Sequence, residues 1–199
     1  MAFSDYHRLA DVLKKFKIEP IDHPDLFAGV ADVQPSAFVT ASLHHGLPLA
    51  TAIGTEKARS EMIVVPLLLD LKIHAPDISL FSGVELSVDP EAGLTGVCDF
   101  LVSRTPEQHV VRAPIVTLVE AKNENLREGM AQCLAEMIAA QIFNQREGND
   151  VVTVYGAVTT GSVWKFMSLS GQTVTLDPEE YLISRPEQIL GILIQMAKG

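Results

Sequence analysis

The segment "TLVEAKNENLREGMAQCLAEMIAAQ", residues 117–141, decides the fold. It begins as an apolar strand that ends with an acid and a lysine, and it continues into a long helical pattern. Because side chains alternate along a strand, we expect Val116, Leu118, Glu120 and Lys122 to share one face. A strand that is buried on that face must provide a partner for each of its two final charges.

The patterns on either side of this segment predict an α/β domain with a mixed central sheet and helices on both faces. Hydrophobic residues at helical spacing predict helices over 4–17, 55–74, 125 to about 146, and 186–197. Apolar runs bounded by turn residues predict strands over 79–89, 94–103 and 113–122, followed by "VVTVYGAVTT", "VWKFMSL" and "QTVTL".

Residues 1–54 are expected to form an N-terminal helix and an extension that packs on a main domain of residues 55–199. Prolines interrupt this extension, which leaves short strands near "SAFVTASL" and "PLATAIG" as the expected elements. Pro66 lacks the backbone donor that a helix needs, so we expect a kink or a break in the helix over 55–74.

Composition limits the class of protein. With 199 residues, 47% of them hydrophobic, the chain is long enough for one sizeable core. A net charge of −10 argues against tight non-specific binding to nucleic acid, although a local basic groove is compatible with it. Cys98 and Cys133 lie in apolar surroundings without metal-ligand spacing, so reduced thiols and a cytoplasmic location are expected. No apolar run approaches the about 20 residues of a membrane span.

Asp99 is the second unusual acid, because it lies between Val97 and Leu101 on one face of a predicted strand. If the strands over 94–103 and 113–122 are neighbours, Asp99 and Glu120 come close together and repel each other. One interpretation is a buried ion pair of either acid with Lys122. The other is a divalent cation held by both carboxylates, and hard oxygen ligands suit Mg²⁺ or Mn²⁺.

A third acid lies on the helix predicted over 55–74. Ala58, Glu61, Val65 and Leu68 follow one another at steps of three and four, which places Glu61 on or beside the stripe that faces the sheet. Two interpretations of Glu61 are open: it joins the other acids, or it lies at the edge of the stripe and reaches water.

These residues together resemble the PD-(D/E)XK, or restriction-endonuclease-like, nuclease superfamily. The resemblance is carried by "GVCD" at 96–99, by "EAK" at 120–122 after a gap of twenty residues, and by Glu61 and Gln132 in the flanking helices. Cys98 stands where the signature has proline. The resemblance covers residues 55 to 169 and implies an αβββαβ core of helix, three antiparallel strands, helix and a further strand.

The resemblance also implies a function and a site. The protein would be a Mg²⁺-dependent deoxyribonuclease, of restriction or repair type, that hydrolyses phosphodiester bonds in DNA. Asp99, Glu120 and the backbone carbonyl of Ala121 would hold Mg²⁺ (or Mn²⁺), and Glu61 would help to bind the same or a second ion. Lys122 would lie beside the attacking water.

Gln132 would contact Lys122 or the DNA backbone, as a glutamine does in the RecB-like branch. An alternative function is a catalytically inactive nuclease-like fold that acts as a protein-interaction module. The net charge of −10 and the lack of a DNA-reading module favour the alternative, whereas the intact Asp99, Glu120 and Lys122 favour the nuclease. The C-terminal helix or the N-terminal extension could form a homodimer interface, and no membrane partner is expected.

Overall fold

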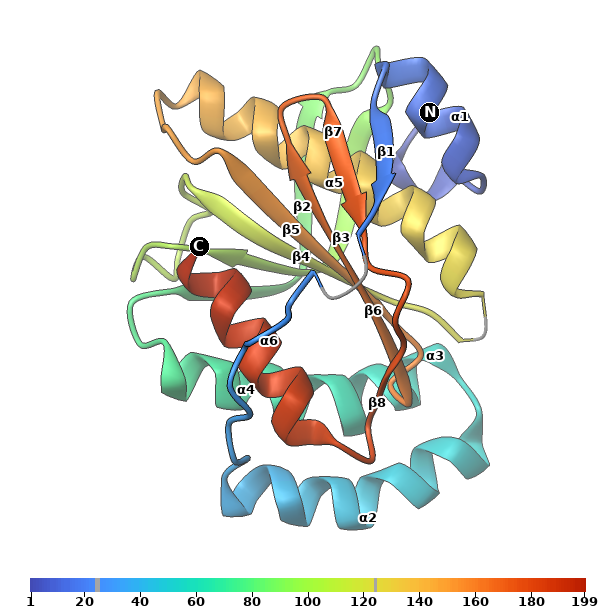
Figure 1. Ribbon diagram of the computed structural model, residues 1–199, viewed down its shortest axis with the longest axis vertical. Helices are drawn as coiled ribbons and strands as arrows, with labels where there is room; N and C mark the ends of the chain where they lie inside the picture. The colour runs from blue at the N-terminus through green and yellow to red at the C-terminus, as the bar shows by residue number, and fades with distance from the viewer. Residues whose placement is uncertain (24–25, 124) are drawn as a thin grey trace.

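The computed structural model describes residues 1–23, 26–123 and 125–199. It is an α/β structure with an open, mixed, eight-stranded sheet flanked by helices, as the sequence predicts (Figure 1). The strand order is β1-β7-β6-β5-β4-β3-β2, and the short β8 pairs with β6. Two pairs, β1 with β7 and β4 with β5, are parallel, and the other neighbouring pairs are antiparallel.

The strands and helices have the following bounds. The strands are β1 (Glu19–Asp22), β2 (Ser79–Asp89), β3 (Leu94–Ser103), β4 (Ile115–Ala121), β5 (Thr153–Thr159), β6 (Val163–Ser170), β7 (Thr173–Leu176) and β8 (Tyr181–Leu182). The helices are α1 (Leu9–Phe16), α2 (Ala37–Ile53), α3 (Glu56–Arg59), α4 (Val65–His74), α5 (Leu126–Arg146) and α6 (Pro186–Lys198). A 3₁₀ turn, Phe3–Asp5, and a π-helical turn, Ser60–Val64, complete the set.

The two faces of the sheet carry different helices. Helices α1 and α5 cover one face, where the core includes Leu101, Leu118 and Val158. Helices α4 and α6 cover the other, and α2 packs outside against α4 and the π-helical turn (Figure 1). Among the described residues, no helix is both long and apolar enough to cross a membrane.

The predicted strands over 79–89, 94–103 and 113–122 and the predicted helices over 125–146 and 186–197 are confirmed within a few residues. The start of α5 shows why. The side chain of Asn125 accepts a hydrogen bond from the backbone N–H of Glu128 at 3.2 Å, and its amide nitrogen donates to the Glu128 carboxylate at 3.2 Å. This capping arrangement satisfies donors that the helix itself leaves free, so the boundary is encoded locally.

The expectation of short strands over residues 36–54 is wrong, because this region forms the 17-residue helix α2 with Pro48 inside it. Ser36 caps its start by accepting from the N–H of Val39 and by donating its own N–H to Asp70 of α4 at 2.9 Å. Gly54 ends it with a positive φ of 72°. Tertiary contacts with α4 therefore override the local signal of the proline.

Two smaller expectations at the N-terminus also differ. The helix predicted over 4–17 is a 3₁₀ turn followed by the shorter α1. The strands β1 and β8 were not expected, since β1 has only four exposed residues and gains its order by pairing in parallel with β7. Short edge strands of this kind lack the alternating pattern that identifies a strand from sequence.

The helix predicted over 55–74 is interrupted, as Pro66 suggested, but the break precedes the proline. A five-residue π-helical turn, Ser60–Val64, joins α3 to α4, and Pro66 lies in the first turn of α4, where its missing N–H costs little. The wider turn rotates the residues after α3, so Glu61 is exposed instead of facing the sheet. Of the two interpretations of Glu61, the one that is confirmed places it at the edge of the stripe, where its side chain reaches water.

The predicted face of β4 needs one correction. Thr117 pairs with Val102, but Ile115 pairs with Ser103, so the strand contains a bulge around Val116. As a result Val116 lies in the core beneath α4 and α6, whereas Leu118 lies in the core beneath α5. The alternation resumes after the bulge, and this places the final charged residues of β4 toward α5.

Candidate functional site

The acids predicted to cooperate lie on the neighbouring antiparallel strands β3 and β4. Phe100 pairs with Val119, and one step further along the same register Asp99 lies opposite Glu120. The backbone N–H of Ala121 donates a hydrogen bond to Asp99 Oδ2 at 2.9 Å. Asp99 is only partly buried, and its strand neighbour Val97 is 57% exposed. The register therefore brings the two carboxyl groups to the same end of the sheet.

Glu120 is almost completely buried, with 1% of its side chain exposed. The ammonium group of Lys122 lies 2.6 Å from Glu120 Oε1, so one carboxylate oxygen is paired. The second oxygen, Oε2, is buried and has no hydrogen-bond partner among the residues that the structure describes. A buried carboxylate oxygen that accepts no hydrogen bond is costly, and the carboxyl group of Glu136 lies beside that of Glu120.

Lys122 is held from a second side by α5. Its ammonium group donates to Gln132 Oε1 at 3.0 Å, which matches one of the two contacts expected for Gln132. The helix can approach this closely because residue 129 is glycine. A Cβ atom on Gly129 would lie 2.9 Å from Cγ of Lys122 and 2.5 Å from Cγ1 of Val158. Any larger residue would push α5 away from the lysine.

Sequence reasoning missed Glu136, which continues this contact chain. Gln132 Nε2 donates to Glu136 Oε1 at 3.2 Å, and Glu136 is fully buried. The two residues are four apart, so they lie on the same side of α5, next to the end of β4. The available signal was an acid within a run of buried alanine and methionine, where a charge is rarely found without a partner.

Glu61 occupies a different position. A cavity of about 270 Å³ lies between the π-helical turn, the middle of β3 and the end of β4, and Glu61, Asp99 and Ala121 line it together with Glu56, Lys57, Ser60, Val65, Ser82 and Phe100. Glu61 is paired with Lys57 at 2.6 Å, and its side chain is 54% exposed. The structure thus places Glu61 and Asp99 on one cavity, and Glu120 with Lys122 and Gln132 toward α5.

The charges of this cluster perturb one another. Burial raises the pKa of Glu120 to about 7, and the charge of Asp99 adds to this, while Lys122 opposes it. Burial raises the pKa of Asp99, with the hydrogen bond from Ala121 acting against it. The pKa of Glu136 is raised well above its usual range by burial and by Glu120. Burial alone would lower the pKa of Lys122, but the adjacent Glu120 outweighs it and the pKa is raised.

The donor set can be tested against Mg²⁺. Glu120 offers the buried, unpartnered Oε2, and Asp99 uses only Oδ2 in its hydrogen bond with Ala121. Within the described parts of the chain, no group of three or more Asp, Glu, His or Cys side chains is arranged to hold a metal ion. Mg²⁺ retains several waters and commonly binds through one or two carboxylates, so these two acids fit it better than a metal that needs a complete protein cage.

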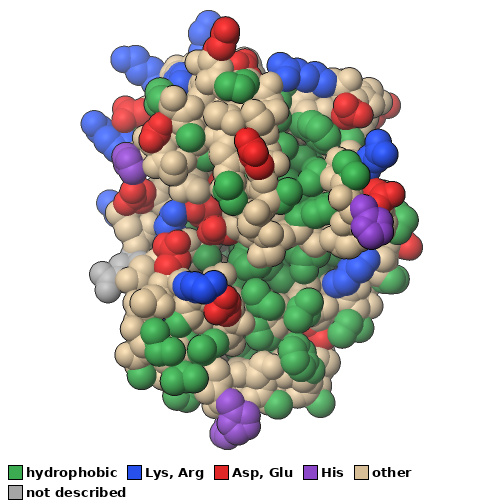
Figure 2. Space-filling model, turned by 180° about the vertical axis from the view of Figure 1, so that it is seen from behind, with side chains coloured by type: hydrophobic (Ala, Val, Ile, Leu, Met, Phe, Trp, Pro, Cys, Tyr) green, Lys and Arg blue, Asp and Glu red, His purple; other side chains and the backbone are tan. Residues whose placement is uncertain are grey.

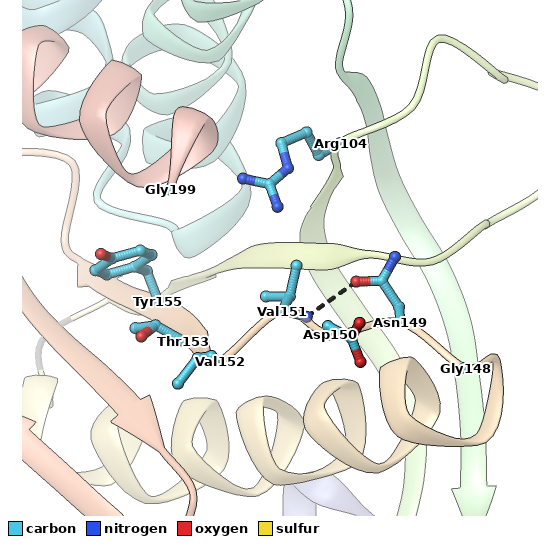
Figure 3. A pocket seen from close by; sticks show the side chains of 9 residues that line it. All are labelled: Arg104, Gly148, Asn149, Asp150, Val151, Val152, Thr153, Tyr155 and Gly199. Atoms are coloured by element: carbon cyan, nitrogen blue, oxygen red, sulfur yellow. Dashed lines mark hydrogen bonds between the residues drawn. The ribbon is translucent and has the colours of Figure 1, made fainter.

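Other surface features lie apart from this cluster. A cavity of about 570 Å³ is lined by Arg104, Asn149 and neighbouring residues at the start of β5, whereas the cluster lies beside the end of that strand (Figure 3). No predicted site residue lines it. Figure 2 shows acidic and basic side chains side by side on one part of the molecular surface and a broad hydrophobic area on another.

The two cysteines are buried and form no disulfide. Burial raises the pKa of both thiols, with nearby acids including Glu136 adding to it, so neither is activated as a nucleophile. Comparison of the sequence with models of known families and with curated proteins finds no match to either.

Proposed function

We propose that the protein is a Mg²⁺-dependent deoxyribonuclease of the restriction or repair type. The observation that carries the proposal is the end of β4, where Asp99 and Glu120 lie opposite each other on adjacent strands and Lys122 is fixed 2.6 Å from Glu120. A paired set of hard oxygen ligands with a lysine beside it suits the hydrolysis of a phosphodiester, because negative charge grows on the phosphate during the reaction.

The element order supports a restriction-endonuclease-like core. The segment from α3 to α4 is followed by the antiparallel strands β2, β3 and β4, then by α5 and by β5, which is parallel to β4. This is the αβββαβ order that the resemblance implies. In this proposal residues 55–199 form the nuclease domain, and residues 1–54 form an extension in which α1 packs on α5 and β1 extends the sheet.

Each side chain has a defined role in the proposal. Asp99, Glu120 and the carbonyl of Ala121 would hold Mg²⁺ (or Mn²⁺), and Glu61 would approach from the π-helical turn, across the cavity that Asp99 and Ala121 line. The ion, when bound, lowers the pKa of a coordinated water and neutralises charge on the phosphate. Lys122 would orient the attacking water and stabilise the negative charge that forms near it.

Lys122 can perform this role only if its ammonium group stays in place. Glu120 and Gln132 hold it by two contacts of 2.6 and 3.0 Å, and its side chain is 20% exposed, so it remains accessible to a substrate at the surface. A flexible lysine loses rotamer entropy when it is fixed. Because these contacts already fix Lys122 in the folded protein, that entropy is not lost during the reaction. A cytoplasmic location belongs to the same proposal, since two buried free thiols suit a reducing compartment.

The test is cleavage of linear, nicked and branched DNA in the presence of Mg²⁺ or Mn²⁺. We expect the wild-type protein to cleave at least one form, EDTA to stop cleavage, and Asp99→Asn and Glu120→Gln each to reduce the rate by at least about 100-fold. Glu85→Gln, which changes an exposed acid on β2, is the matched control and should retain full activity. Absence of cleavage with either metal, or full activity in both site variants, would contradict the proposal.

A second function is a catalytically inactive module that binds other proteins or forms a homodimer. The supporting observation is that Lys122 pairs with Glu120 and Lys57 with Glu61, so lysine side chains neutralise two of the three acids. Apolar side chains are also exposed on the outer helices, among them Phe38, Leu49 and Ile53 of α2 and Leu69 and Ile73 of α4. In that case the site variants would alter stability only, and no DNA would be cleaved.

A further inference from the structure

Glu136 is a buried acid for which the proposed reaction provides no role. Its side chain is completely inaccessible to solvent, and its neighbours Ala135 and Met137 are buried as well. Oε1 accepts a hydrogen bond from Gln132, Oε2 accepts none from a donor within the described residues, and the carboxyl group lies beside that of Glu120. Burying a carboxyl group with an unsatisfied oxygen costs several kcal/mol, and a leucine at this position would avoid the cost. The acid therefore needs an explanation other than helix packing.

The explanation lies in the geometry of the glutamine side chain. The amide of a glutamine has nearly the same shape after a half-turn, so its partners decide which end carries the oxygen and which the nitrogen. Gln132 directs Oε1 toward the Lys122 ammonium at 3.0 Å and Nε2 toward Glu136 at 3.2 Å. An ammonium group only donates hydrogen bonds, so after a half-turn the amide NH₂ group would face another donor and Lys122 would lose this contact.

We infer that Glu136 is a positioning residue for Lys122. By accepting a hydrogen bond from Nε2, it selects the orientation of Gln132 in which Oε1 faces the lysine, and this holds the ammonium group beside Glu120. The catalytic consequence rests on the proposed nuclease function, whereas the orientation of Gln132 does not. The hydrogen bonds run from Glu136 to Gln132 to Lys122, so Glu136 positions the lysine through Gln132, while its carboxyl group also interacts directly with that of Glu120.

The orientation can be measured without any activity. In a ¹⁵N-edited NMR spectrum, the side-chain amide of Gln132, assigned by its absence in Gln132→Leu, should show slow hydrogen exchange and a shift distinct from exposed glutamines. Glu136→Leu should remove both properties. Glu136→Gln, which retains an acceptor oxygen of similar geometry, should restore them in part. Gln145→Leu, which changes an exposed residue of the same helix, should leave the Gln132 signals unchanged.

The catalytic consequence is tested by a double-mutant cycle on DNA cleavage. Glu136→Leu should lower kcat about 10-fold with KM unchanged, the scale seen when a residue that orients a catalytic group is removed. Glu136→Gln should recover most of this loss. In a Gln132→Leu background, Glu136→Leu should have a clearly smaller effect, because the part of its action that passes through Gln132 is already lost. A residue that only stabilises the fold would lower activity in both backgrounds alike.

The outcomes separate the two proposals. If the wild-type protein cleaves no DNA, the proposed function fails, and the NMR measurement still decides whether Glu136 orients Gln132. If cleavage occurs and Glu136→Leu has normal kcat, or if its effect adds fully to that of Gln132→Leu, the inference is overturned while the nuclease stands. Thermal unfolding checks that each variant is folded. Should Glu136→Leu not fold, the same cycle is run with Glu136→Gln, for which a roughly 3-fold loss of kcat, smaller in the Gln132→Leu background, is expected by the same reasoning.

Discussion

The two ends of β4 are both held by polar side chains of α5, but in different ways. At the first end, Asn144 accepts from the N–H of Ile115 at 2.7 Å and donates to its carbonyl at 2.8 Å. Asn144 is buried, and both ends of its amide are used. At the other end, Glu120 and Glu136 lie beside each other, and each has a buried oxygen that accepts no hydrogen bond from a donor within the described chain.

This difference separates a structural polar contact from a candidate functional one. A buried amide that satisfies a strand terminus stabilises the fold and leaves nothing for a ligand to use. A buried carboxylate with an open oxygen reduces stability, and such groups are found where a protein has a use for them. Asn144 and Glu120 therefore make opposite predictions for stability and for activity.

The largest expected effect is at the charged end of β4. Lys122→Met should retain the aliphatic volume of the side chain but remove the ammonium group, and cleavage of DNA should fall by about 100- to 1000-fold because a preorganised charge is lost. Single-turnover cleavage with Mg²⁺ measures this. Lys14→Met, on the exposed side of α1, is the control. Normal cleavage by Lys122→Met would show that the polar residues at both ends of β4 have only a structural role.

The second prediction concerns pH. The pKa of Glu120 rises from 4.5 to about 7 in the folded protein, chiefly through burial, so the folded state binds this proton more tightly than the unfolded state. Its contribution to stability is complete below pH 4.5 and is lost as the pH rises through about 7. In EDTA, the free energy of unfolding should fall over this range by on the order of 3 kcal/mol more than in Glu120→Gln. Equal pH dependence in the two proteins would contradict the account.

The third prediction concerns the first end of β4, where Asn144 binds the backbone of Ile115. Asn144→Leu should reduce the free energy of unfolding by about 2 kcal/mol, because the N–H and carbonyl of Ile115 lose their partners while buried. Denaturant unfolding measures the change, with Gln145→Leu as the exposed control on the same helix. Cleavage per folded molecule should be unchanged. An Asn144→Leu protein that is stable but inactive would show that Asn144 serves the activity and not the stability of the fold.

The smallest effect is expected for Glu61. Its side chain is half exposed and paired with Lys57, so its ion pair contributes less than about 1 kcal/mol to stability. We expect Glu61→Gln to leave unfolding unchanged and to reduce cleavage less than 10-fold, since Asp99 and Glu120 provide the deeper oxygen atoms. Steady-state cleavage at varied Mg²⁺ concentration measures it. A loss as large as that of Lys122→Met would make Glu61 a primary metal ligand.

Much of the fold around this site could be predicted from the sequence. The strands β2, β3 and β4 carry clear turn residues at their ends, and α5 carries the Asn125 cap, so local signals and the final structure agree. The approach of Asp99 to Glu120 follows from the register of two neighbouring strands. The contact of Lys122 with Gln132 is one of the two contacts that the resemblance implies, and the small Gly129 on α5 permits it.

The rest depended on tertiary structure. The bulge at Val116 and the π-helical turn before Pro66 each shift the pattern by one residue, and neither shift is visible in periodicity. Helix α2 has no charged residue to mark an outer face, and Pro48 resembles a break. Glu136 lies within an apolar run of α5, but only the packing of α5 against β4 shows that its side chain is buried.

The most direct test of the central claim is the binding of a divalent cation at the charged end of β4. Isothermal titration of the wild-type protein with Mg²⁺ or Mn²⁺ should give a binding heat that is absent in Asp99→Asn and in Glu120→Gln, because each substitution removes one of the two carboxylates. Glu85→Gln should bind as the wild type does. Equal heats from the wild type and both site variants would show that these acids hold no metal ion.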